Sequence, residues 1–416
     1  MSKVNVVIFL DPKSYGYRDN DNSNFARKIM IRYCTLCVLP ATKPDLAFSP
    51  SGECQACINY ANRAVVDYKQ RESELVEILT AQQKTMKTAW DCVAPVSGGK
   101  DSTFQILTVK RLGFNPLAVT SITCDLTPIG RRNLDNLRAL GVDHIDFSPN
   151  LKIRSLLNRI GLEEVGDISW AEHVGIFTLP VRVAISFEIP LIIWGENSQN
   201  EYGGPPEMAE NRVLDRRWLE EFGGLLGLRV SDIAQRKGLT EQEVHLYTYP
   251  ETSELERLGV SGLFLGSFIP WDGMQNALQA QRAGFEVWPR QILGSAVNYE
   301  DLDNFQAGIH DYFKYLKYGF GRAADLVSMH VRRGRLSRSR ALEVAREADG
   351  KYPWSYLDKP LEQILRPLEV SVERFNQICD DFTNHSLFEN DASGNLVRDS
   401  RGDLIKINYD NVSPSL

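Results

Sequence analysis

The sequence has little of several features that define common protein classes. Its 416 residues include only seven cysteines, too few for a disulfide scaffold in a chain of this length. It also lacks a surplus of positive charge, because 47 Lys and Arg residues against 54 Asp and Glu residues give a net charge of −7. Proteins that bind mainly by neutralising nucleic-acid phosphates need such a surplus. We therefore expect no nucleic-acid partner.

Long hydrophobic runs are missing as well. The apolar stretch at residues 4–10 is too short to span a bilayer and lacks the basic region and cleavage site of a signal peptide. We therefore expect a cytoplasmic protein with no membrane partner. The length and the 43% hydrophobic content are sufficient for two or three domains with a large core.

Four of the cysteines form two Cys-x-x-Cys pairs, which are separated by sixteen residues: Cys34, Cys37, Cys54 and Cys57. Four thiolates at this spacing suit tetrahedral Zn²⁺ in a closed, structural site. Unligated thiols, a redox pair or a partner-binding ribbon are the alternatives. The other three, Cys92, Cys124 and Cys379, are isolated in the sequence, and we interpret Cys92 and Cys124 as core residues rather than a sulfur relay.

Strand and helix patterns alternate between residues 88 and 200. Strands are predicted at 91–96, 116–124, 144–147 and 191–194, and helices at 100–112, 133–140 and 177–187. This alternation predicts right-handed crossovers and an α/β fold with an open, mostly parallel sheet and helices on both faces. A long helix is expected at 61–90, and residues 263–269 are a candidate for one more strand. Further helices are expected at 207–236, 300–317 and 337–348.

A glycine-containing loop joins the first predicted strand to its helix: Ser97, Gly98, Gly99, Lys100, Asp101 and Ser102. The glycines allow successive N–H groups to point into one concavity, and the helix N-terminus adds positive potential. The two serine hydroxyls can donate to the same anion. An ordinary Gly-Gly turn is the alternative. The loop resembles the SGGxDS pyrophosphate-binding loop of ATP pyrophosphatases, which cleave ATP between its α and β phosphates.

Polar residues directly follow two other predicted strands. Asp125 follows 116–124, and Glu196 and Asn197 follow 191–194. Open parallel sheets bind ligands at the carboxyl ends of their strands. We therefore expect Asp125 to bind the Mg²⁺ that accompanies ATP, and Glu196 and Asn197 to hold magnesium or the acceptor. Capping of turns is the alternative for all three.

The remaining polar clusters are less specific. The six histidines include no pair with metal or triad spacing; His173 could face the cleft or lie on the surface. Basic residues are concentrated at 314–340. They form either a solvated helix face or an anion-binding site, for example for the diphosphate of a sugar nucleotide.

Taken together, these segments are similar to the N-acetyl sugar amidotransferase family of the ATP pyrophosphatase (PP-loop) superfamily, which acts in surface-polysaccharide and flagellar-glycan synthesis. The resemblance covers about residues 31–355. It rests on RYCTLCVLP with GECQACINY, on VSGGKDST, on LIIWGENS, on FLGSFIPWD, and on YEDLDNFQAGIHDYFKYLKYGFGRAAD with GRLSRSRAL. The segment at Trp170 to His173 departs from our expectation of the family.

The resemblance implies an ATP- and Mg²⁺-dependent enzyme that also holds Zn²⁺. It would adenylylate the N-acetyl oxygen of an acetamido sugar and replace it with ammonia from a separate glutaminase subunit. Lys100, Asp101, Glu196 and Asn197 would be catalytic. Ser97, Gly98, Gly99, Asp101, Ser102 and Asp125 would bind the nucleotide and its metal. A tRNA-modifying ligase or thiolase, and a non-catalytic zinc-ribbon scaffold, are the alternatives.

The predicted organisation has five parts. They are an irregular lead (1–30), a zinc module with four cysteine ligands (31–60), the ATP-binding α/β domain with its leading helix (61–200), a mainly helical acceptor or partner region (201–388) and a polar tail (389–416).

Overall fold

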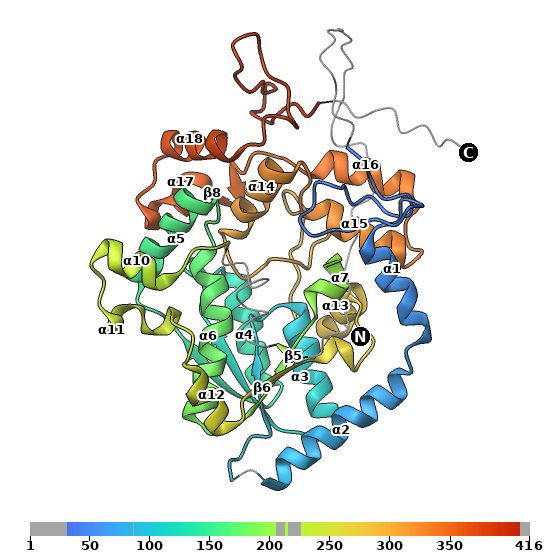
Figure 1. Ribbon diagram of the computed structural model, residues 1–416, viewed down its shortest axis with the longest axis vertical. Helices are drawn as coiled ribbons and strands as arrows, with labels where there is room; N and C mark the ends of the chain where they lie inside the picture. Colours follow the sequence, from blue (N-terminus) through green and yellow to red (C-terminus); the bar gives the residue numbers. More distant parts are fainter. Residues whose placement is uncertain (1–30, 86, 205–212, 215–225, 408–416) are drawn as a thin grey trace.

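The computed structural model describes residues 31–407, except 86, 205–212 and 215–225 (Figure 1). The predicted lead at 1–30 lies outside the described residues, as does most of the helix predicted at 207–236. Within the described residues, no helix is long and apolar enough to cross a membrane.

A six-stranded sheet forms the centre of the α/β unit. Its strands are β1 (Cys92–Pro95), β2 (Pro116–Ser121), β3 (Asp143–Phe147), β4 (Leu191–Trp194), β5 (Val213–Leu214) and β6 (Ser261–Phe264). Their order is β3-β2-β1-β4-β6-β5, and every pairing is parallel except the antiparallel pair of β5 with β6. The predicted open, mostly parallel sheet is confirmed, and it takes β5 and β6 from beyond residue 200.

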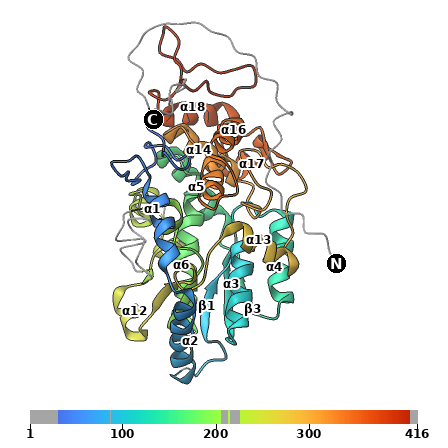
Figure 2. The same cartoon turned by 90° about the vertical axis from the view of Figure 1, so that its right-hand side faces the viewer.

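Helices cover both faces of the sheet (Figure 2). Helix α6 (Trp170–Ser186) packs on the face that carries Val93 and Ile192. The opposite face carries Cys92, Ala94 and Leu191. It is covered by three helices: α2 (Tyr68–Thr85), α3 (Lys100–Arg111) and α4 (Pro128–Ala139). Because successive side chains of a strand point to opposite faces, a sheet buried on both sides needs apolar residues at nearly every position.

One helical prediction in this unit is wrong, and one helix was not predicted. The single helix predicted at 61–90 is α1 (Gln55–Asn62), a short 3-10 helix η2 (Arg63–Val65) and α2. The side chain of Asp67 accepts hydrogen bonds from the N–H groups of Lys69 and Gln70, both at 3.0 Å, so a new helix begins there. Helix α5 (Leu151–Val165), capped by Asn150, was not predicted.

The rest of the chain is mainly helical. Its helices are α7 (Ser198–Tyr202), α10 (Val230–Lys237), α11 (Glu241–Val244), α12 (Thr252–Leu258), α13 (Gly273–Arg282), α14 (Ala307–Tyr318), α15 (Arg322–Arg332), α16 (Arg338–Ala348), α17 (Leu361–Leu365) and α18 (Val372–Phe382). This part also has three short 3-10 helices: η3 (His245–Tyr247), η4 (Leu265–Ser267) and η5 (Arg366–Leu368). It has one antiparallel hairpin, formed by β7 (Ser355–Tyr356) and β8 (Lys359–Pro360). Val213 and Leu214 form a strand inside the predicted helix 207–236, and α14 begins later than the predicted residue 300.

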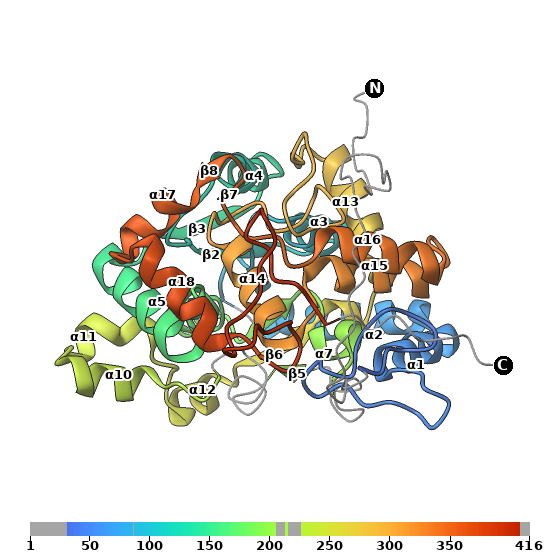
Figure 3. The same cartoon turned by 90° about the horizontal axis from the view of Figure 1, so that it is seen from above.

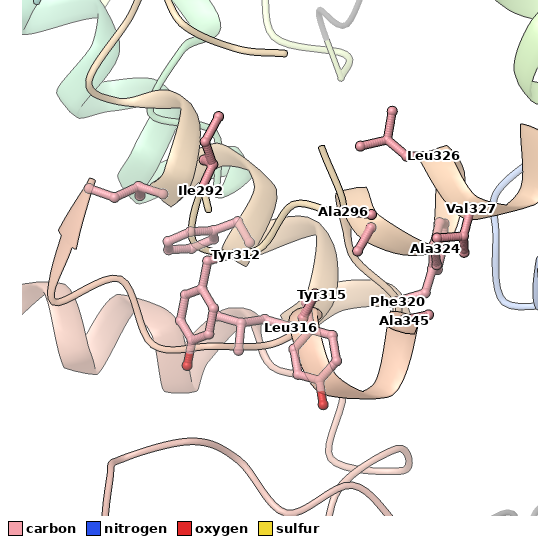
Figure 4. Packing of buried hydrophobic residues seen from close by; sticks show 14 of the residues in the cluster. Ile292, Ala296, Tyr312, Tyr315, Leu316, Phe320, Ala324, Leu326, Val327 and Ala345 are labelled. Carbon is pink, nitrogen blue, oxygen red and sulfur yellow. The ribbon is translucent and has the colours of Figure 1, made fainter. Parts of the chain in front are cut away.

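One large hydrophobic core joins the first and last parts of the chain. It contains the four paired cysteines together with buried residues of α14, α15 and α16, such as Tyr315, Val327 and Ala345 (Figure 4). The segment predicted as a polar tail at 389–416 contributes too, since Leu404 is buried. In Figure 1 these helices lie together at one end of the sheet.

Candidate functional site

The SGGKDS loop lies between β1 and α3, as the sequence predicts. Gly98 has φ +81°, and a Cβ there would lie 2.9 Å from the Leu134 side chain, so this position requires glycine. Helix α3 has no side-chain cap at Gly99, which leaves its first N–H groups available to an anion. The Ser97 N–H donates to Ser102 Oγ at 2.9 Å. The loop thus holds donors at the positive end of a helix.

A cavity of about 220 Å³ opens beside this loop. Ser97, Asp101 and Ser102 form its polar side, and Ile176, Pro180 and Trp194 contribute to an apolar wall. The indole Nε1 of Trp194 has no hydrogen-bond partner among the described residues. Ligand sites commonly combine apolar walls with a few convergent polar groups, so this cavity is the candidate active site.

Lys100 lies in the loop but does not line the cavity. Its ammonium is buried between the carboxylates of Asp101, at 2.6 Å, and Glu300, at 2.5 Å. Asn276 of α13 donates to the other oxygen of Asp101 at 2.8 Å. Helix α13 packs against α3 (Figure 3). These contacts fix the first turn of α3 against the later part of the chain.

Two carboxyl groups near Lys100 have pKa values shifted in opposite directions. Burial and the nearby Asp101 carboxylate raise the pKa of Glu196 to about 8. Burial alone would also raise the pKa of Glu300, but Lys100 and Arg322 hold it at about 2. Carboxyl groups whose pKa values are pushed apart in this way are frequent at catalytic sites. Asn197, adjacent to Glu196, is buried.

Asp125 and Asp303 lie near the carboxyl end of β2, which ends at Ser121. Both oxygens of Asp125 accept from Lys359 Nζ at 2.6 Å, and Asp125 does not line the cavity, whereas Asp303 does. Burial and the neighbouring Asp301 raise the pKa of Asp303 to about 7. Magnesium binding by Asp125 therefore stays a prediction, and in this conformation its carboxylate is already neutralised.

The two Cys-x-x-Cys pairs meet in one buried cluster. The Sγ atoms of Cys34 and Cys57 are 3.8 Å apart, those of Cys37 and Cys54 are 3.6 Å apart, and all four lie within 4.8 Å of one another. The N–H of Cys54 donates to Cys34 Sγ at 3.2 Å. Four converging, buried sulfurs fit a closed tetrahedral Zn²⁺ site. We call the segment at 31–60 that carries them the four-cysteine module.

The basic concentration at 314–340 is mostly internal rather than a solvated helix face, and anion binding there stays a prediction. Arg338 Nε donates to the carbonyl oxygens of Cys34 and Cys37 at 3.1 and 3.0 Å, and Arg332 approaches Cys37 Sγ. Arg322 pairs with Glu300 at 2.5 Å, and Arg333 pairs with acidic residues as well. These cations connect the four-cysteine module and the loop to the helical region rather than facing solvent.

The isolated cysteines are poorly suited to sulfur chemistry. Cys92 and Cys379 are fully buried. Burial, with a contribution from Glu172, raises the pKa of Cys124 to about 11. Thiolate is the reactive form of cysteine, so Cys124 is predominantly a thiol at neutral pH.

Sequence reasoning missed several residues of the site. Glu300, Asn276 and Arg322 reach the loop from elements that lie far along the chain from it. No local spacing signals these contacts, because each depends on how α13 and α15 pack beside α3. Glu300 belongs to the YEDLDNF segment, but the sequence assigns it no partner.

Comparisons with known proteins match one part of the chain to a described family. Residues 296–401 match the family described as "LPS biosynthesis protein WbpG-like, C-terminal domain", a stretch that includes the YEDLDNF segment and α14 to α18. No curated protein matches the chain. Among solved structures, NMN synthetase from Francisella tularensis aligns with 47% of this chain and 92% of its own, at 16% identity and a TM-score of 0.26.

Proposed function

We propose that the protein is an ATP-dependent amidotransferase that converts the N-acetyl group of a sugar into an acetamidino group. The observation that carries the proposal is the SGGKDS loop at the head of α3, which borders a cavity large enough for part of a nucleotide. The WbpG-like match at 296–401 supports a role in lipopolysaccharide biosynthesis.

The reaction would begin with activation of the amide. An amide carbonyl is a poor electrophile, and its oxygen cannot leave as oxide. Attack by this oxygen on the α-phosphorus of ATP would form an O-adenylyl imidate and break the bond to pyrophosphate. Ser97, Ser102 and the N–H groups of α3 would hold that pyrophosphate, because they are positioned where negative charge accumulates.

Ammonia would then complete the exchange. Its lone pair adds to the imidate carbon, the carbon–oxygen bond breaks, and the oxygen departs in AMP. The proton lost by nitrogen needs an acceptor, and Glu196 is a candidate because its pKa of about 8 suits proton transfer near neutral pH. Asn197 would orient the acceptor.

The donor set near Lys100 fits Mg²⁺. Asp101 lines the cavity beside the loop, and carboxylate oxygens are ligands that Mg²⁺ prefers. Asp101 would hold the ion, which would neutralise phosphate charge when bound. Lys100 would keep Asp101 oriented.

The ammonia source would be a separate glutaminase subunit. Ammonia must arrive unprotonated, which favours delivery from a docked partner over bulk solution. A purified chain that uses glutamine as efficiently as ammonium salts would overturn this part of the proposal without affecting the first step.

The thiolase alternative is less well supported. It needs a reactive cysteine, and the cysteines outside the four-cysteine module are buried or have a raised pKa. The scaffold alternative predicts no AMP formation with any acceptor.

One experiment tests the reaction and identifies the acceptor. The purified chain is incubated with ATP, ammonium and a panel of nucleotide-linked acetamido sugars, and the products are analysed by mass spectrometry. We expect AMP, pyrophosphate and a sugar in which NH replaces oxygen. ADP and phosphate, or no sugar-dependent turnover across the panel, would contradict the proposal.

A further inference from the structure

A second group of metal-ligating side chains lies outside the nucleotide loop and the four-cysteine module. His173 Nδ1 and His310 Nδ1 each lie 2.9 Å from a different oxygen of Asp167. All three ligand atoms lie within 4.8 Å of one another. Among the described residues, only this triad and the cluster of four cysteines show such convergence.

The three side chains come from rigid and separate elements. Asp167 belongs to the loop after α5, His173 to the first turn of α6, and His310 to the first turn of α14. The loop is held close to α5, because the Asp167 N–H donates to Gly161 O at 3.0 Å. A Cβ at Gly161 would clash with the Trp170 side chain, so this close approach needs glycine.

A buried amide fixes the two histidine-bearing helices relative to each other. Asn158 of α5 accepts from the Ala171 N–H at 2.9 Å and donates to Gln306 Oε1 at 3.2 Å. Asn158 and Gln306 are fully buried. Metal sites depend on such outer contacts to hold their ligands in place.

The exposure of the triad differs from that of the four paired cysteines. Asp167 is 3% exposed, whereas His173 and His310 are 27% and 38% exposed. Structural zinc sites are closed by four ligands, while sites with three protein ligands keep a position for water or substrate. The triad therefore has the composition and the access of an open site.

The electrostatic surroundings favour a cation. Asp301 and Asp311 act on His310 in addition to Asp167, and the ammonium of Lys317 acts on Asp167. Arg322 is shared between Asp301 and Glu300. The carboxylates around the histidines are thus incompletely neutralised.

One residue of the triad, His173, is about one helical turn from a residue that lines the cavity described above. His173, Ile176 and Pro180 lie at helical spacing on one face of α6, and Ile176 and Pro180 line the cavity. Asp303, which also lines it, is in the same acidic segment as Asp301.

We propose that Asp167, His173 and His310 form a second metal site, which binds a divalent transition-metal ion and leaves a coordination position open toward solvent. Two imidazoles with one carboxylate suit Zn²⁺, Fe²⁺, Mn²⁺ or Ni²⁺ rather than Mg²⁺ or Ca²⁺. The open position would take water or an oxygen of a bound molecule. The site stands on geometry and charge, and its test does not depend on the proposed amidotransferase reaction.

Metal content of the full chain gives the direct test, with zinc as the probe. After incubation with excess Zn²⁺ and removal of unbound ion, elemental analysis should find two zinc ions per chain in the wild type. The double variant His173→Asn and His310→Asn should retain one. Asparagine still offers an N–H to Asp167, so the hydrogen bonds and the fold are preserved while the imidazole ligands are lost. His385→Asn, an exposed histidine outside the triad, should retain both ions.

Cobalt distinguishes the two sites independently. Co²⁺ at the four paired cysteines gives strong sulfur-to-metal absorption, whereas Co²⁺ at the triad adds only weak bands typical of nitrogen and oxygen ligands. We expect the double variant to lose the weak bands alone. A wild type that binds one ion at any zinc excess, or a double variant that keeps both ions, would overturn the proposal and leave the triad as a hydrogen-bonded cluster.

Discussion

The four-cysteine module and the nucleotide cavity use polar groups in opposite ways. In the module, four buried sulfurs converge and receive backbone N–H groups, and Arg338 secures the surrounding carbonyls. Next to the cavity, burial raises the pKa of Glu196, and in the cavity wall Trp194 Nε1 lacks a hydrogen-bond partner among the described residues. Buried polar groups are normally satisfied. The polar groups of the module are therefore satisfied within the chain and fit one metal ion, whereas the cavity wall carries a polar group that a ligand can satisfy.

Loss of one zinc ligand should have the largest effect of all. We expect Cys54→Ser to release zinc and lower the free energy of unfolding by several kcal/mol, because metal binding contributes directly to folding. The same core includes α15 and α16, so the damage should spread to them, as hydrogen exchange would reveal. Cys124→Ser, outside the module, should retain zinc. A Cys54→Ser protein with unchanged thermal stability would contradict the structural role.

Removing Asp101 should affect chemistry rather than folding. Lys100 keeps Glu300 as a partner in Asp101→Ala, so thermal unfolding should change little. AMP release should fall by at least about 100-fold, the usual effect of removing one group that stabilises charge in the transition state. Asp135→Ala, on the surface of α4, is the control. Equal turnover in both variants would remove the loop from the mechanism.

Alanine substitutions at the two adjacent glycines of the loop distinguish an effect on backbone strain from an effect on ligand binding. Gly98→Ala forces a side chain into positive φ and against Leu134, which should cost about 1–3 kcal/mol of stability. Gly99 has φ −74°, and its Cβ would meet only Ser97 Oγ, at 3.3 Å. Gly99→Ala should therefore fold normally but bind ATP weakly, as calorimetry would measure. Equal stability of the two variants would refute the distinction.

Neutralising Glu196 should stabilise the protein in a pH-dependent way. The folded pKa of Glu196, about 8, lies above the ordinary 4.5. The wild-type free energy of unfolding is therefore not reduced by Glu196 below pH 4.5, and it falls as pH rises from 4.5 through 8. Glu196→Gln should therefore match the wild type in acid and exceed it by up to about 5 kcal/mol above pH 8. Denaturant unfolding at several pH values measures this, with exposed Glu362→Gln as the control. A constant difference across the range would contradict the assignment.

The sequence was sufficient for features that depend on local patterns. The parallel strands, the loop before α3 and the cysteine spacing each follow from neighbouring residues, and the structure confirms the sheet and the convergence of the cysteines. Helix α16 also agrees with the predicted 337–348. These features share short-range causes: side-chain periodicity, glycine conformation and ligand spacing.

Features that depend on distant contacts could not be predicted. Glu300 acquires its role only because the C-terminal region packs beside α3, and the basic residues near 332 become internal because the four-cysteine module lies over them. His173 and His310 are 137 positions apart in the chain, so no spacing rule joins them. The break after Val65 was missed because Asp67 acts through a cap rather than through apolar periodicity.

A heavy-oxygen label in the sugar acetamido carbonyl tests the central claim most directly. The labelled sugar is incubated with the protein, ATP and ammonium, and the phosphorus products are analysed by mass spectrometry. If the cavity beside the SGGKDS loop activates the amide by adenylylation, the label appears in the phosphate of AMP, and pyrophosphate is unlabelled. Label in inorganic phosphate with formation of ADP, or label retained in the sugar while AMP accumulates, would contradict the account.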